Sequence, residues 1–321
     1  MLRSMYSGIS GLKNFQTKLD VIGNNIANVN THGFKKGRVL FKDLISQTQA
    51  GASSPTSTRG GVNPQQIGLG SQLAAIDTIH GGGSLQGTGR ALDLGIEGDG
   101  FFMVADANGA PDDTGAITEE GFNNTLFTRN GVFYMDKNGY LVNADGKYLV
   151  GVSAGDELVV EADDTGIIPE DAPNASGDDG ANLFDDDGVL TPEDGTLGPI
   201  RIPTTAKELS IGQDGTVTYV DLNGDLQWAG QLIMAKFPNA GGLAKVGSNY
   251  YQQTANSGAA YGQVGTVAGM GKIQPGALEM SNVDLSEEFT EMIVAQRGFQ
   301  ANTRIITTSD EILQELVNLK R

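Results

Sequence analysis

Hydrophobic residues recur at helical spacing near the start of the chain. Two heptad positions carry them, and the residues are Leu2, Met5, Ile9, Leu12, Leu19 and Ile26. The pattern ends close to Gly33, a residue type that commonly follows a helix C-terminus. We therefore expect an N-terminal helix within residues 1–33.

A second heptad pattern occupies the end of the chain. Its seven-residue series is unbroken and consists of Leu285, Met292, Phe299, Ile306 and Leu313. Ser281 and Asp284 have the spacing of a capping box, and Glu287 and Glu288 follow where acidic residues favour a helix start. This pattern predicts a long helix within residues 271–321.

The middle of the chain shows short β-forming runs separated by tight turns. The turn dipeptides are Asn138-Gly139, Asp145-Gly146, Asp214-Gly215 and Asn223-Gly224. Such dipeptides between apolar runs are typical of β-hairpins. The predicted strands cover residues 133–135, 140–142, 148–150, 216–220, 226–228 and 231–235.

These patterns predict an α+β protein in which the N- and C-terminal helices pack together as an α-helical coiled-coil domain. The middle domain is then discontinuous and mostly β. The expected boundaries are residues 1–33 for the first helix, 34–86 for an extended connector, 87–150 and 199–270 for the β domain, 151–198 for an insertion and 271–321 for the second helix. The helices are expected to pair because neither can bury its apolar stripe alone. The alternative is an ordinary α+β domain whose terminal helices cover the sheet.

Acidic residues are concentrated in the insertion. The formal net charge of the chain is −18, and residues 156–194 contain fourteen Asp and Glu residues with no Lys or Arg. Without this stretch the net charge is about −4. We therefore expect a solvated acidic insertion, and no nucleic-acid partner.

The residues offer little for catalysis or metal binding. Cys is absent, and His32 and His80 have no spacing typical of a catalytic triad or a metal site. Aligning Gly188 with position six of an EF-hand loop places Leu183 where Asp is required, which disfavours calcium. No rigid pair of carboxylates points to a glycosidase. We expect no enzyme, no cofactor, no signal peptide and no membrane insertion; a calcium-binding or carbohydrate-active exported protein is the remote alternative.

Several long motifs resemble the flagellar rod and hook family of axial proteins. Residues 20–35, which read DVIGNNIANVNTHGFK, resemble the N-terminal signature of that family. Residues 276–321 resemble its C-terminal region, and shorter matches occur at 89–94, 98–102 and 127–131. Residues 5–12 and 88–90 are closer to hook proteins than to distal rod proteins, so the resemblance favours the hook, with the distal rod as the alternative.

The resemblance implies a subunit that polymerises helically with other copies of itself. The implied product is the hook, a flexible joint that transmits motor torque and encloses the export channel outside the cell. The implied partners are rod, hook-cap and hook–filament junction proteins and the flagellar type III export apparatus. The two apolar series are then the helix-packing and polymerisation residues. Asn24, Asn25 and Asn28 join them, because their amides can bond to packed helices or to the following backbone.

Overall fold

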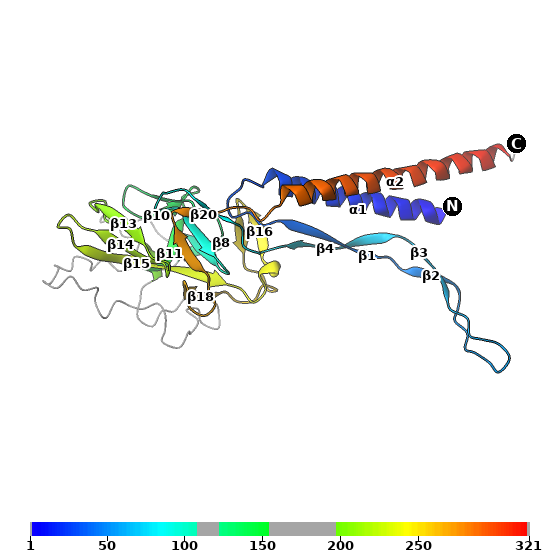
Figure 1. Ribbon diagram of the computed structural model, residues 1–321, viewed down its shortest axis with the longest axis horizontal. Coiled ribbons are helices and arrows are strands. Elements are labelled where there is room, and N and C mark those ends of the chain that lie inside the picture. Colours follow the sequence, from blue (N-terminus) through cyan, green and yellow to red (C-terminus); the bar gives the residue numbers. More distant parts are fainter. Residues whose placement is uncertain (1, 108–121, 154–196, 320–321) are drawn as a thin grey trace. The chain divides into compact units, whose positions relative to one another are not determined.

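The computed structural model describes residues 2–107, 122–153 and 197–319 (Figure 1). The chain forms two compact units. The helical unit comprises Met1–Val29, Lys35–Ile79 and Val283–Arg321, and the β unit comprises Asn30–Phe34 and His80–Asn282. Two terminal helices and a mostly β middle, as the sequence predicts, are confirmed.

The helical unit contains both helices and two β ribbons. Its elements are α1 (Leu2–Ala27), β1 (Gly37–Asp43), β2 (Ser46–Ala50), β3 (Gln65–Gly68), β4 (Ser71–Thr78) and α2 (Leu285–Asn318). β1 pairs with β4 and β2 pairs with β3, both antiparallel. Together the four strands form one long hairpin, and the segment expected to be an extended connector is this hairpin.

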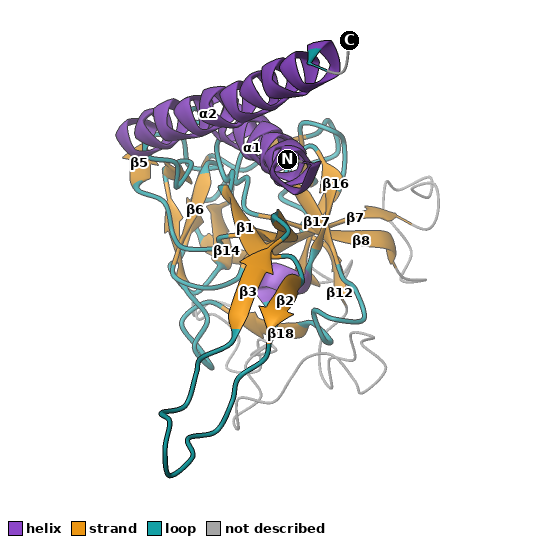
Figure 2. Cartoon of the chain, turned by 90° about the vertical axis from the view of Figure 1, so that its right-hand side faces the viewer, coloured by secondary structure: helices purple, strands orange, loops and turns teal. Residues whose placement is uncertain are grey.

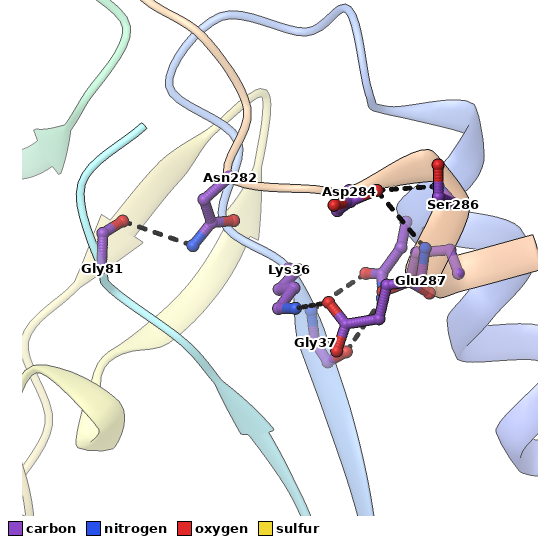
Figure 3. A network of polar contacts seen from close by, with 9 residues as sticks. Lys36, Gly37, Gly81, Asn282, Asp284, Ser286 and Glu287 are labelled. Carbon is purple, nitrogen blue, oxygen red and sulfur yellow. Dashed lines mark hydrogen bonds and ion pairs between the residues drawn. The ribbon is translucent and has the colours of Figure 1, made fainter. Parts of the chain in front are cut away.

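The ends of the helices differ from the sequence expectation. Asp284 is the N-cap of α2, and its carboxylate accepts hydrogen bonds from the backbone N–H groups of Ser286 (2.8 Å) and Glu287 (3.3 Å) (Figure 3). The expected capping box starting at Ser281 is therefore wrong by three residues, because the chain is still non-helical through Val283.

Gly33 does not terminate α1, as its position suggests, but allows a close backbone approach. α1 ends at Ala27, so Gly33 is not its capping glycine. Its φ is +70°, and a Cβ there would lie 2.5 Å from the carbonyl carbon of Arg129. Glycine is required because the backbone of residues 129–130 passes too close for a side chain.

The β unit is built from antiparallel strands. They are β5 (Leu85–Gly87), β6 (Leu94–Glu97), β7 (Phe101–Ala107), β8 (Phe122–Thr128), β9 (Phe133–Met135), β10 (Leu141–Asn143), β11 (Tyr148–Ser153), β12 (Leu197–Pro199), β13 (Glu208–Ile211), β14 (Thr216–Val220), β15 (Leu226–Lys236), β16 (Ala244–Gly247), β17 (Tyr250–Gln252), β18 (Tyr261–Val264), β19 (Lys272–Pro275) and β20 (Ala277–Glu279), with a 3-10 turn at Ala240–Gly242. The main sheet follows the order β13-β14-β15-β11-β7-β8-β17-β16. The four predicted turn dipeptides connect β9, β10 and β11, and β13, β14 and β15.

The central strands of this sheet are buried on both faces. Along β7, Phe102 and Val104 join one apolar cluster, whereas Phe101 and Met103 join another. β15 alternates in the same way between the two clusters. Successive side chains of a strand point to opposite faces, so the sheet has a core on each side.

The two strands expected at residues 226–228 and 231–235 are one strand, β15. Its register against β14 shifts between Val217, opposite Gly230, and Thr218, opposite Trp228. The intervening Ala229 is the extra residue of a bulge, and Gly230 has a φ of +152°. A bulge kinks a strand without ending it, and glycine tolerates the unusual backbone angle.

A buried ion pair lies in the β unit. Arg129 and Glu279 are almost fully enclosed, with side-chain exposures of 2% and 0%, and Nη1 lies 3.2 Å from Oε2. Arg129 also donates to the carbonyl of Gly98 at 2.8 Å, and Glu279 accepts from the backbone N–H of Gly83 at 2.9 Å. Burial raises the pKa of the neighbouring Tyr251 to about 12.

Replacing Arg129 by Met should lower the free energy of unfolding by about 3–5 kcal/mol, because it removes the buried positive charge that pairs with the Glu279 carboxylate. Urea denaturation followed by the fluorescence of Trp228, the single tryptophan, measures this change. Lys272→Met is the matched control, since the Lys272–Glu97 pair is half exposed and should contribute at most about 1 kcal/mol. Equal losses in the two variants would contradict the prediction.

Candidate assembly surface

α1 and α2 lie side by side and run in opposite directions (Figures 1 and 2). Gly8 lies beside Ile306, Gly11 beside Asn302, and Gly298 beside Phe15. A Cβ at Gly11 would come within 2.8 Å of Asn302 Nδ2, and one at Gly298 within 2.5 Å of the Phe15 ring. Glycines on both helices therefore set how closely the helices approach.

The fully buried positions of the two helices hold few large apolar side chains. The buried positions of α2 are Glu288, Ala295 and Ser309, and those of α1 are Gly8, Gly11, Asn14, Ile22 and Asn25. Among them only Ile22 is both large and apolar, and Phe15 and Ile306, which lie at the contact, are half-buried. Because apolar area removed from water drives packing, the pair gains modest stability from its own contact.

Asn25 connects three segments of the helical unit. Its Nδ2 donates to the carbonyl of Gly37 and its Oδ1 accepts from the N–H of Gly37, both at 2.9 Å. The same Nδ2 lies 3.2 Å from Oε1 of the buried Glu288. The end of α1, the start of β1 and the first turn of α2 thus meet at one amide. Lys36 and Glu287 add an ion pair at 2.8 Å (Figure 3).

The other two asparagines bond within their own helix turn. Asn28 Nδ2 donates to the carbonyl and to the side-chain oxygen of Asn24, both at 2.9 Å. These bonds close the last turn of α1, where backbone carbonyls lack helical partners. Asn24 itself is exposed.

The predicted apolar residues whose side chains are described are half-buried or exposed, and Ile306 among them faces Gly8 of α1. Half-buried are Met5, Leu12, Leu19, Ile26, Met292, Ile306 and Leu313. Exposed are Ile9 (47%), Leu285 (39%) and Phe299 (37%). Leu2 opens α1, and its side chain lies outside the described part of the structure. Part of each described apolar side chain therefore remains available for contact.

The hairpin continues this apolar surface. It packs along α1, where Asn14 Nδ2 donates to Ser71 Oγ at 2.8 Å and the rings of Phe15 and Phe41 are 6.5 Å apart. Its exposed large apolar side chains are Leu40, Phe41, Ile45, Val62, Ile67, Leu73 and Ile76. Figure 2 shows the hairpin loop extending beyond β2 and β3. An exposed apolar surface of this size is typical of an interaction site.

Sequence reasoning missed two parts of this surface. The glycines of the seam carried a signal, because Gly8, Gly11, Phe15, Lys18 and Ile22 have the three-and-four spacing of a contact stripe. The sequence signal for the hairpin was weaker and consisted of the β-forming residues Val39-Leu40-Phe41 and Leu73 to Ile76. Ser, Thr, Gln and Gly are abundant between these two runs, and this composition is typical of an unpaired loop, so the pairing of β1 with β4 and of β2 with β3 was not predicted.

The described residues contain neither a candidate metal site nor a helix that could span a membrane. No group of three or more His, Asp or Glu residues could hold a metal ion there. No described helix is long and apolar enough to span a bilayer. The calcium hypothesis for residues 183–188 concerns a segment outside the described residues. His80 packs edge-on against Phe101 and Tyr251, with ring centroids 5.6 and 5.3 Å apart.

Three family models match the chain. Residues 5–35 match "Flagella basal body rod protein", residues 95–219 match "Flagellar hook protein FlgE/F/G D1 domain", and residues 274–319 match "Flagellar basal body rod FlgEFG protein C-terminal". The first and last matches cover most of α1 and α2, and the middle match lies in the β unit.

The relatives that match over their full length include both basal-body rod proteins and hook proteins. The flagellar basal-body rod protein FlgG of Bacillus subtilis is 50% identical over 323 residues, covering 100% of both chains. The flagellar hook protein FlgE of Borreliella burgdorferi is 35% identical over 457 residues, again covering both chains fully. A solved structure, a flagellar hook protein of Helicobacter pylori, aligns at 11% identity and a TM-score of 0.36, covering 61% of this chain and 100% of that chain, a similarity too low to add to the assignment. The identities over the full length show that this chain belongs to the family of flagellar rod and hook proteins.

Proposed function

We propose that this chain is a structural, non-enzymatic subunit of the distal rod of the flagellar basal body. The observation that carries the proposal is the 50% identity over the full length to a basal-body rod protein of nearly equal length. Similarity to a hook protein is lower and requires an alignment of 457 positions. The hook, favoured by two short motifs in the sequence, remains the second candidate.

The proposed activity is polymerisation with identical copies. Apolar side chains are exposed on α1, α2 and the hairpin, and few fully buried positions of the two helices are large and apolar. Contacts between different surfaces of identical subunits generate an open helical filament. In that filament α1, α2 and their neighbours would form the coiled-coil layer, using Leu2, Met5, Ile9 and the other predicted apolar residues.

The remaining parts of the proposal follow from this assignment. The partners would be adjoining rod, hook, hook-cap and junction proteins, and the subunit would reach its place through the flagellar type III export apparatus without a cleaved signal peptide. The β unit would need no neighbour to complete its core, since its apolar clusters are already buried within a single chain.

An epitope tag distinguishes rod from hook. The turn at Leu222 is suitable, because that side chain is 59% exposed and the turn belongs to the β unit. In cells whose motility the tagged chain restores, gold label on isolated hook–basal bodies should be confined to the straight rod. Label along the curved hook would instead support the second candidate. Untagged cells give the background.

A charge on the exposed apolar surface should block assembly. Ile9→Asp places a carboxylate where α1 is half exposed, so the single chain should unfold at nearly the same temperature. Burial of that unpaired charge between copies should abolish sedimentable polymer. Leu222→Asp is the control, since Leu222 is also exposed but belongs to the β unit. Normal polymer from Ile9→Asp would contradict the role given to α1.

The helices should gain most of their stability on assembly. Few of their fully buried positions are large and apolar, whereas ordering each residue costs about 1–2 kcal/mol of backbone entropy. Amide hydrogen exchange of α1 and α2 should therefore be fast in the soluble chain and slow in the polymer. The amides of β7 and β15 are the internal reference, because those strands are buried on both faces. Equal protection of helices and strands in the soluble chain would refute this expectation.

A further inference from the structure

The last turns of α2 extend beyond the N-terminus of α1 (Figure 1). Gly11 of α1 faces Asn302 of α2. Because the helices are antiparallel, each residue back along α1 corresponds to one residue further along α2, which places Leu2 level with Glu311 along the axis. Residues 312–319, which we call the overhang, therefore have no part of α1 beside them.

The stripe of α2 that faces α1 changes its composition at the overhang. Alongside α1 the stripe is small or polar except for one isoleucine, and its members are Glu288, Glu291, Ala295, Gly298, Asn302, Ile305 and Ser309. The same three-and-four spacing continues into the overhang with Ile312, Leu316 and Leu319, which are 42%, 48% and 82% exposed. Large apolar side chains thus become continuous where α1 ends, so their contact partner is not the α1 of the same chain.

The end of α2 and the first half of α1 carry opposite charges. Residues 2–18 contain basic and no acidic side chains, whereas residues 305–319 contain acidic and no basic ones. The basic residues are Arg3, Lys13 and Lys18, and the acidic residues are Asp310, Glu311 and Glu315. Two basic residues follow at 320–321, outside the described part of the structure. Lys13 and Glu311 are both exposed, and neither forms an ion pair with a described residue.

We propose that the overhang binds the first half of α1 of a second copy, which points in the same direction as the first copy and is displaced by eleven residues, about 16–17 Å along the axis. This displacement brings three pairs level between the copies, which are Ile312 with Leu12, Leu319 with Met5, and Glu311 with Lys13. One register therefore satisfies the apolar residues and the charges together. The inference rests on the proposed polymerisation and specifies one of its contacts.

The two surfaces are separate parts of one chain. Within a chain they cannot meet, because Lys13 lies level with Gln300 and Glu311 is about 16 Å further along the axis. Each copy therefore offers its overhang to one neighbour and its α1 to another. Such a contact is heterologous, and because each copy is displaced along the axis, the contacts continue into an open filament instead of closing.

Charge reversal tests the pairing of Lys13 with Glu311. The variants are Lys13→Glu, Glu311→Lys and the double variant of both, and sedimentation of the purified full chain measures the critical concentration for polymerisation. Each single variant should raise the critical concentration by about fivefold, because attraction between copies becomes repulsion. The double variant, which restores opposite charges, should return to within about twofold of the wild type.

Matched variants separate this contact from general charge effects. Glu208→Lys alters an exposed residue of β13, and combining it with Lys13→Glu restores the wild-type net charge without restoring the pair, so it should give no rescue. Leu316→Asp places a charge in the overhang and should raise the critical concentration by about tenfold. Val246→Asp, at an exposed apolar position of β16, should leave it unchanged. Far-ultraviolet circular dichroism of the soluble variants should match the wild type.

The outcomes distinguish this inference from the proposed function. Wild-type chain that never forms polymer overturns the proposed function, and the inference falls with it. Wild-type polymer with unchanged single variants, or with a double variant as defective as either single variant, overturns the Lys13–Glu311 contact and leaves the proposed function intact. Loss in both single variants, with rescue only in the matched double variant, supports the contact between the overhang and α1 of the second copy.

Discussion

The close contact between α1 and α2, whose fully buried positions are mostly small or polar, governs the rest of this structure. The helices approach closely because Gly8, Gly11 and Gly298 face larger side chains, and close approach improves van der Waals contact. Yet the buried positions of α2 are Glu288, Ala295 and Ser309, which contribute little hydrophobic free energy. Two helices whose large apolar residues stay partly exposed are suited to packing with further helices.

Polar contacts fix the positions of α1, β1 and α2 relative to one another within the helical unit. Asn25 bonds to the backbone of Gly37 as another strand would, and it also meets Glu288. Asp284 fixes the first turn of α2. Such bonds contribute modest net free energy but are specific in direction, so they define where α1, β1 and α2 begin or end relative to one another.

The β unit is stabilised differently, and this division suits a polymer subunit. Its central strands are buried on both faces, and the Arg129–Glu279 pair is enclosed and hydrogen-bonded to the backbone. The unit therefore has a complete core within one chain. In the helical unit, by contrast, Ile9 and Val294 are about half exposed, as are the apolar side chains of the hairpin. Assembly can then bury the surface of one unit while the other stays folded.

The sequence by itself determined the kinds of element and their order. Heptad spacing predicted both helices, and the Asn-Gly and Asp-Gly dipeptides predicted four turns, because these signals are local and depend on backbone geometry within a few residues. Long motifs also identified the family. Only the tertiary structure decided that the Ser- and Gly-rich connector is a paired hairpin, that β15 is one bulged strand, and that Asp284 rather than Ser281 caps α2. It also decided that Gly8, Gly11 and Gly298 lie at the contact between α1 and α2, where Gly8 meets Ile306 of the apolar series. Each of these depends on which distant segment supplies the opposite surface, such as Ser71 for Asn14, Gly37 for Asn25 or Phe15 for Gly298, and sequence spacing carries no information about such partners.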